Sequence, residues 1–283
     1  MPTIRRPTVA SQFYEGDAEA LRAQITSCFL SPLGPKKLPK VNLHMHPRKI
    51  VGLICPHAGY LYSGPVAAHS FYELAIDGKP DRVVLLGPNH TGYGSALSIM
   101  REGAWRTPLG DVEVDSGLAD AILHETQVVD VDETAHRYEH SIEVQLPFLQ
   151  FLFGNTFKIV PICFLMQDYD SAVEVGRALT EALDATNTVV IASSDMTHYE
   201  PAKSAASKDQ AALKAVIDMD ARRFYQTVET QNITACGFAP ITSLITYGVG
   251  ACAKAELLSY HNSGDVTGDH SSVVGYAAVS FKK

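Results

Sequence analysis

Long apolar runs and clustered basic residues are both missing from this 283-residue chain. No apolar run approaches the roughly 18 residues that span a bilayer, and residues 1–7 lack the apolar stretch of a signal peptide. The net charge is −8, and the densest basic cluster, Lys36, Lys37 and Lys40, lies in a short proline-rich segment. Because nucleic acids and anionic membranes are bound through clustered Lys and Arg, we expect neither as the main partner.

Paired cysteines are missing as well. The five cysteines are odd in number and widely spaced, with no Cys-x-x-Cys pair, which argues against a disulfide framework or a structural zinc cage. This usage favours the reducing cytoplasm. Cys28, Cys55, Cys163 and Cys252 lie in apolar helix- or strand-like runs, and we predict that all four are small buried residues. Cys236 differs, because a glycine follows it.

Signatures of several common enzyme classes are also missing. The chain has no Walker P-loop, no Gly-x-Gly-x-x-Gly after a strand, no Gly-x-Ser-x-Gly elbow and no His-Glu-x-x-His. The composition, with 46% hydrophobic and 19% charged residues, is typical of a well-packed globular protein. The chemistry of this folded protein must therefore come from another kind of site.

Apolar strand-like runs alternate with helical patterns along the chain. Short apolar runs predict strands at 49–55, 82–86, 158–164, 188–192, 255–261 and 272–281, and turn residues predict a β-ribbon at 95–114. Helical patterns lie at 17–29, 64–74, from 116, at 141–153 with either a kink or a late start at Pro147, at 170–183, at 202–229 with a break near 218–220, and after 237. The alternation indicates a parallel or mixed sheet covered on both faces, in one α/β/α domain spanning residues 1–283.

Two histidines follow strand-like runs in the same way. His57 comes two residues after the run that ends at Cys55, and His90 follows the next run after a Gly-Pro-Asn turn. In an open α/β sheet, residues just beyond the carboxyl ends of the strands point into a shared crevice. A lone histidine in such a turn is more often hydrogen-bonded than metal-bound, but the equivalent placement of two favours a pair of metal ligands.

Asp195 and His198 lie beyond a third strand-like run. Their spacing of three residues can place both on one side of a helical turn. Asp195 would then be a ligand or an orienting partner, and His198 a general base, since imidazole titrates near neutral pH. Alternatively, Ser193, Ser194 and Asp195 cap the next helix, and both roles can hold together.

Two further side chains have an ambiguous context. Cys236 precedes a predicted helix, whose N-terminus would lower the thiol pKa and favour the ligating thiolate; a small residue suited to tight packing is an equal alternative. His140 lies in a polar cluster at a helix start and either lines the crevice or caps its own helix. Two histidines with one anionic ligand are typical of mononuclear non-haem iron oxygenases. A thiolate as the anion makes the site softer, so Fe(II), Cu and Zn are all candidates.

Six stretches that span nearly the whole chain in order carry a family pattern. They are residues 6–14 (RPTVASQFY), 56–64 (PHAGYLYSG), 86–90 (LGPNH), 139–148 (EHSIEVQLPF), 193–199 (SSDMTHY) and 235–237 (ACG). In these stretches the sequence resembles the Memo family, which is similar in fold to the LigB-type class III extradiol dioxygenases. The resemblance implies a three-layer α/β/α fold with a central mixed, largely parallel sheet.

The resemblance also implies roles for individual residues. His57 and His90 match the two histidines that hold iron in the dioxygenase relatives, and His198 matches their base. Cys236 stands where these relatives have a glutamate, a replacement shared with Memo proteins that argues against ordinary extradiol ring cleavage. Asp195 then becomes a candidate additional ligand.

Two kinds of function follow from the resemblance, because eukaryotic Memo proteins are described both as metal-binding redox proteins and as phosphotyrosine-peptide adaptors. Tyr62 matches a residue of the peptide pocket, and Phe13 stands where the eukaryotic pattern has a tryptophan. We expect first a metal-dependent, dioxygenase-like oxidoreductase that holds Fe(II), with Cu or Zn as alternatives, and acts on a small molecule or peptide. His198, Asp195 and His140 are its candidate catalytic residues. The alternatives are a non-catalytic pocket for a small acidic ligand or phosphopeptide, and zinc-dependent hydrolysis.

Overall fold

The computed structural model describes residues 3–43, 47–183 and 186–283. Within these ranges the larger of two sheets has nine strands in the order β10-β12-β2-β9-β3-β8-β4-β7, with β11 paired to β12. Its strands are β2 (Ile50–Cys55), β3 (Arg82–Pro88), β4 (Leu97–Ile99), β7 (Asp130–Val131), β8 (Lys158–Phe164), β9 (Thr188–Ser193), β10 (His198–Glu200), β11 (Lys254–Asn262) and β12 (Val273–Lys282).

The centre of this sheet is parallel and buried on both faces. Strands β2, β9, β3 and β8 run parallel to their neighbours, whereas β12 and β4 join this group antiparallel. Successive residues point to opposite faces. Leu53 and Val83 accordingly lie in one hydrophobic cluster, and Ile54 and Val84 lie in the other. Burial on both faces explains why these strands read as continuous apolar runs in the sequence.

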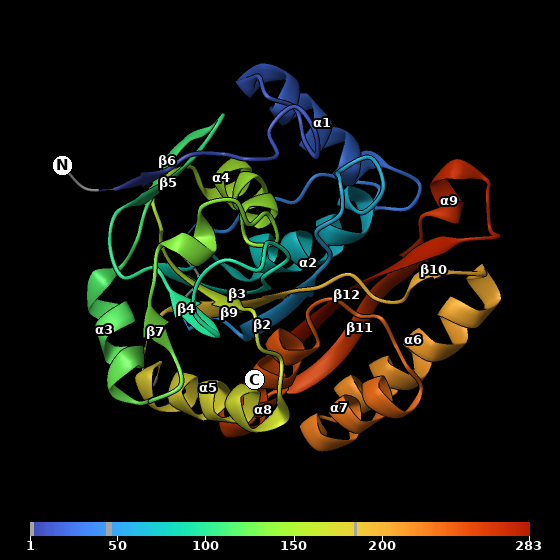
Figure 1. Cartoon of the computed structure of the whole chain (residues 1–283). Helices are drawn as coiled ribbons and strands as arrows, with labels where there is room; N and C mark the ends of the chain where they lie inside the picture. Colours follow the sequence, from blue (N-terminus) through green and yellow to red (C-terminus); the bar gives the residue numbers. More distant parts are fainter. Residues whose placement is uncertain (1–2, 44–46, 184–185) are drawn as a thin grey trace.

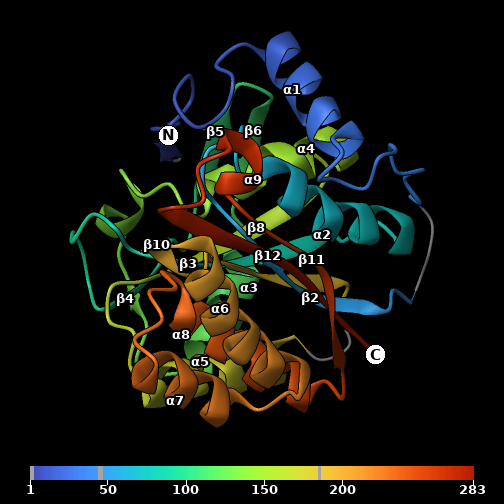
Figure 2. The same cartoon turned by 90° about the vertical axis from the view of Figure 1, so that its right-hand side faces the viewer.

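Helices cover both faces of the sheet (Figures 1 and 2). One hydrophobic cluster joins the sheet to α1, α2 and α4, and the other joins it to α3, α5, α6, α7 and α8. This arrangement confirms the predicted three-layer α/β/α fold with a mixed, largely parallel sheet. The helices are α1 (Ala18–Leu30), α2 (Gly64–Asp77), α3 (Ser116–His124), α4 (Leu146–Phe153), α5 (Tyr169–Ala182), α6 (Ala202–Ile217), α7 (Ala221–Thr230), α8 (Phe238–Gly250) and α9 (Gly264–Thr267).

Several element boundaries follow directly from local sequence. The Asp17 side chain accepts hydrogen bonds from the first-turn N–H groups of α1, as expected of an N-cap. Helix α4 starts late, at Leu146, because Pro147 fits only the first turn and a 3-10 turn precedes it. The predicted break at 218–220 separates α6 from α7.

Two expectations were wrong. Residues 95–114 are not one ribbon: β4 joins the main sheet beside β8, and only β5 (Ala104–Thr107) and β6 (Gly110–Glu113) form a hairpin, which pairs with β1 (Ile4–Arg5) in the second sheet. All three residues of β4 are buried, which suits a place in the main sheet beside β8. The alternation of polar and apolar residues along the chain does not show which strand β4 will pair with. Cys252 is exposed rather than buried, because it lies at φ 57° in the turn after α8.

Candidate metal centre

Three loops meet at one edge of the sheet. His57, His90 and Asp195 follow the carboxyl ends of β2, β3 and β9, which are parallel neighbours in the order β2-β9-β3. The fourth contribution is Cys236, just before α8. Ligand atoms of His57, His90 and Cys236 all lie within 4.8 Å of one another. The sheet therefore brings together the three residues predicted as ligands from their strand-end and helix-start positions.

The spacing of these donors suits a metal ion. His57 Nε2 lies 3.2 Å from Cys236 Sγ. A metal bound at about 2.0–2.3 Å from a nitrogen and a sulfur holds those two atoms roughly 3–4 Å apart. Two imidazoles and a thiol form a donor set that fits Fe(II), Cu or Zn.

Hydrogen bonds fix the orientation of the His57 ring. Ser193 has one hydroxyl proton and donates it to the carbonyl oxygen of Ser141 at 2.7 Å. Its oxygen, which also accepts from Gln145, must therefore accept from His57 Nδ1 at 2.9 Å. The proton on Nδ1 leaves the lone pair on Nε2, the atom that faces Cys236. Burial, and then the neighbouring histidines, hold the pKa of His57 well below its usual value, so the ring is neutral and able to ligate.

Glu139 orients His90 in a similar way. Its buried carboxylate contacts the His90 backbone N–H and lies 2.9 Å from His90 Nδ1, and it accepts from the N–H groups of His140 and Ser141, each at 2.8 Å. Burial alone would raise the pKa of Glu139, but the hydrogen bond with His90 and nearby charges lower it to about 2. An ionised Glu139 accepts a hydrogen bond from the Nδ1–H group of His90. The lone pair of the neutral ring then lies on Nε2, where a metal could bind.

Asp195 supports the loop that carries His57. Its Oδ1 accepts from the N–H groups of His57, at 2.8 Å, and Ala58, at 3.3 Å, while its own N–H donates to Cys236 Sγ at 3.2 Å. Among the described residues, the close group of ligand atoms does not include the Asp195 carboxylate. The hydrogen bonds of Asp195 thus fix the backbone of the loop that carries His57. The helix-cap alternative is wrong, because α6 begins after Pro201 and has no side-chain cap.

The environment of the Cys236 thiol differs from the expected one. Burial and the nearby Asp195 charge raise the pKa of the thiol, so the predicted lowering by the helix N-terminus is wrong for the protein without metal. Burial removes the water that would stabilise a thiolate, and this effect outweighs the helix. Gly237 allows the backbone after Cys236 to pack closely against Ser193, since a Cβ at position 237 would lie 2.4 Å from the Ser193 carbonyl oxygen.

Of the remaining predicted residues, His140 and Phe13 lie against this centre. The His140 ring stacks on His90 with centroids 4.6 Å apart and lies 5.5 Å from His57, so it lines the site, with Phe13 against its edge at 4.9 Å. His198 is half-buried on β10, and its Nδ1 lies 2.9 Å from the carbonyl oxygen of Thr234. The Tyr62 side chain is exposed on the loop after His57.

Glu139 is the main functional residue that sequence reasoning missed. The available signal was a charged residue beside His140 in the polar cluster at a helix start. Together with His90 and His140, it forms a second group of ligand atoms within 4.8 Å of one another. Ser193 and Gln145, which set the His57 tautomer, gave no separate sequence signal.

The fold and the site define an α/β protein with a possible metal centre of two histidines and a cysteine, and comparisons with known proteins name its family. Memo-like proteins match residues 5–280. A MEMO1 family protein of Methanopyrus kandleri is 49% identical over 283 residues, covering 99% of each chain. Another, of Methanothermobacter thermautotrophicus, is 48% identical over 280 residues and covers 98% of this chain and 100% of its own. The chain therefore belongs to the Memo-like protein family, as its sequence motifs predicted.

A solved structure also shares the fold. An uncharacterized protein of Escherichia coli K12 aligns with a TM-score of 0.51 at 13% identity, covering 82% of this chain and 99% of its own. At this identity the likeness shows the fold alone. Among the described residues, no helix combines the length and apolar character that crossing a membrane requires.

Proposed function

We propose that this protein holds a single redox-active metal ion, Fe(II) or Cu, at His57, His90 and Cys236, and serves a dioxygenase-like redox role on a small molecule. The observation that carries this proposal is the orientation of the histidines. Both have Nδ1 fixed by a hydrogen bond, which leaves Nε2 as the free donor of each ring; His57 Nε2 lies 3.2 Å from Cys236 Sγ, and His90 belongs to the same close group. Such fixed outer partners are typical of metal-bound histidines.

The chain's own groups would support the metal. When bound, Fe(II) or Cu would supply one-electron and oxygen chemistry that amino-acid side chains lack. Glu139 and Asp195 hold the ligand-bearing loops. His140, stacked on His90, and His198 on β10 are the candidate proton carriers. Phe13, packed against His140, gives the site an aromatic wall against which an apolar substrate would pack.

The non-catalytic alternative has weaker support. A pocket for an acidic ligand or phosphopeptide would need positive charge at the histidines. Burial keeps His57 neutral, and the buried Glu139 carboxylate lies 2.9 Å from His90 Nδ1, where its charge would repel an anion. These groups favour a cation at the centre over an anion.

Metal loading tests the proposal directly. Protein purified without oxygen or chelator, then incubated with Fe(II) or Cu(I) and desalted, is expected to retain near-stoichiometric metal by elemental analysis. His57→Ala is expected to retain little, because it removes one of three close donors. His124→Ala is the matched control, since its side chain is 84% exposed. Wild-type protein without retained metal, or equal loading of His57→Ala, would overturn the proposal.

Glu139→Gln tests the orienting role separately. The amide keeps the size of the side chain but loses the charge that accepts the His90 proton. We expect metal affinity to fall about 10- to 100-fold. Glu174→Gln is the control, because Glu174 also accepts side-chain and backbone hydrogen bonds, from Thr126 and Gln127, away from the centre. A correctly folded Glu139→Gln protein with unchanged affinity would contradict this role.

A further inference from the structure

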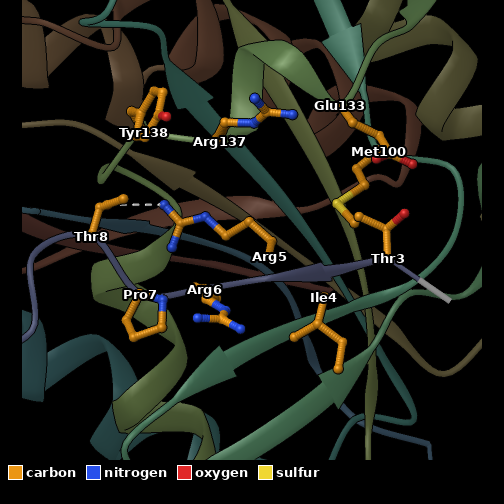
Figure 3. A pocket seen from close by; sticks show the side chains of 10 residues that line it. All are labelled: Thr3, Ile4, Arg5, Arg6, Pro7, Thr8, Met100, Glu133, Arg137 and Tyr138. Atoms are coloured by element: carbon orange, nitrogen blue, oxygen red, sulfur yellow. Dashed lines mark hydrogen bonds between the residues drawn. The ribbon is translucent and has the colours of Figure 1, made fainter. Parts of the chain in front are cut away.

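A hollow lies beyond the residues that face the metal centre. Its volume is about 370 Å³, within the range of small-molecule sites. The N-terminal residues form one wall and the segment before Glu139 forms another (Figure 3). The lining residues are Thr3, Ile4, Arg5, Arg6, Pro7, Thr8, Met100, Glu133, Arg137 and Tyr138.

Positive charge without a partner lines this hollow. Arg5 is buried and neutralised by Glu143. Arg6 and Arg137 are exposed, and within the described part of the chain their guanidinium groups have no hydrogen bond or ion pair. Figure 3 shows their side chains on either side of Arg5. Glu133 contributes one carboxylate, so the lining keeps a net positive charge in a protein whose net charge is −8.

Apolar surface accompanies these charges. Ile4 and Tyr138 supply this surface, since they are 41% and 59% exposed, whereas Met100 is buried and contributes almost none of it. We propose that this hollow binds a small organic anion, with a carboxylate or phosphate monoester beside Arg6 or Arg137 and an apolar body against Ile4 and Tyr138. Guanidinium groups suit such anions because their N–H groups match the geometry of the two oxygens.

The proposed anion site is independent of the metal proposal. Arg137 and Tyr138 line the hollow, whereas the next residues, Glu139 and His140, face the metal centre. Loss of metal binding would leave the hollow and its charges unchanged, so either proposal can fail without the other.

A methionine-methyl NMR titration tests the site. Met100 lines the hollow and Met196 lies next to Asp195, so one protein labelled with ¹³C-methyl methionine reports both places. Met100→Leu assigns the signal. The probes are benzoate, phenyl phosphate, inorganic phosphate and benzamide, the neutral amide that matches benzoate in shape. We expect benzoate or phenyl phosphate to shift Met100 saturably, benzamide to shift it at least tenfold less tightly, and Met196 to stay unchanged.

Variants identify the charges responsible. Arg6→Gln and Arg137→Gln are each expected to weaken anion binding about threefold to tenfold, a modest effect because both guanidinium groups are exposed to solvent. The double variant is expected to abolish the saturable shift. Arg177→Gln is the matched control, because this exposed arginine on α5 has no hydrogen bond or ion pair among the described residues. Tighter binding of phenyl phosphate than benzoate assigns a phosphate ester, and the reverse assigns a carboxylate. The proposal would be overturned by the absence of a saturable shift with either anion, by equal binding of benzamide, or by an equal effect of Arg177→Gln. A response to inorganic phosphate alone would overturn the proposal that the hollow binds an apolar body beside the anionic group.

Discussion

Cys236→Asp is expected to separate the two candidate metals, lowering Cu(I) affinity at least about 100-fold while changing Fe(II) affinity less than about tenfold. Soft thiolate ligands select Cu(I), whereas two histidines with a carboxylate form the usual set for non-haem Fe(II). The new carboxylate can accept the Asp195 N–H that now reaches Sγ at 3.2 Å.

Anaerobic competition against chelators of known affinity measures this change for each ion. Cys252→Asp is the control, because Cys252 is exposed and outside the close group of donors. Cys236→Ser, which provides neither a thiolate nor a carboxylate, is expected to weaken binding of both ions. Undiminished Cu(I) affinity in Cys236→Asp would show that the thiolate is not a ligand.

The histidine pair could be predicted because its position depends on local sequence and one rule of topology. Buried parallel strands read as continuous apolar runs, so strand ends were predicted at Cys55 and Leu86; β2 ends at Cys55, and β3 continues two residues further, to Pro88. The carboxyl ends of neighbouring parallel strands share one edge, which places His57 and His90 together. The observed distance between their ring centroids is 5.2 Å.

The orienting contacts could not be predicted in this way, because they join segments that are distant in sequence. Glu139 reaches back 49 residues to His90, and Ser193 reaches His57 across 136 residues. The prediction of a lowered pKa for the Cys236 thiol was wrong for a related reason. The sequence shows that a helix follows, but the burial that outweighs the helix depends on packing by several loops.

The error in the 95–114 ribbon has a comparable origin. The turn at 108–111 was visible, and it joins β5 to β6 as a hairpin. Residues 97–99 could extend that hairpin or pair with β8, and they pair with β8. This choice depends on packing against residues that are distant in sequence, which no local pattern shows. Local sequence thus predicts the elements better than the partners of short strands.

Arg5→Met is expected to destabilise the protein by about 3–5 kcal/mol, because it leaves the Glu143 carboxylate buried without its countercharge. Arg5 is 5% exposed, contacts Glu143 and the Glu139 carbonyl, and donates from Nε to the His136 carbonyl oxygen at 3.0 Å. Its guanidinium also lies 4.4 Å from the Trp105 ring centroid. The melting temperature should fall by roughly 5–15 °C in a chain of this size.

Two further variants decide whether charge is the cause. Arg101→Met makes the same substitution in an ion pair with Asp120 whose side chains are 53% and 48% exposed, and it should lower the stability far less, because solvent screens the exposed charges. Arg5→Met combined with Glu143→Gln removes both buried charges and should recover a large part of the loss, which calorimetry of the four-protein cycle would measure. Additive effects of the two substitutions would contradict an uncompensated charge. Because Arg5 also contacts the Glu139 carbonyl, Arg5→Met should weaken metal binding in protein that is still folded, which links the N-terminal segment to the geometry of the centre.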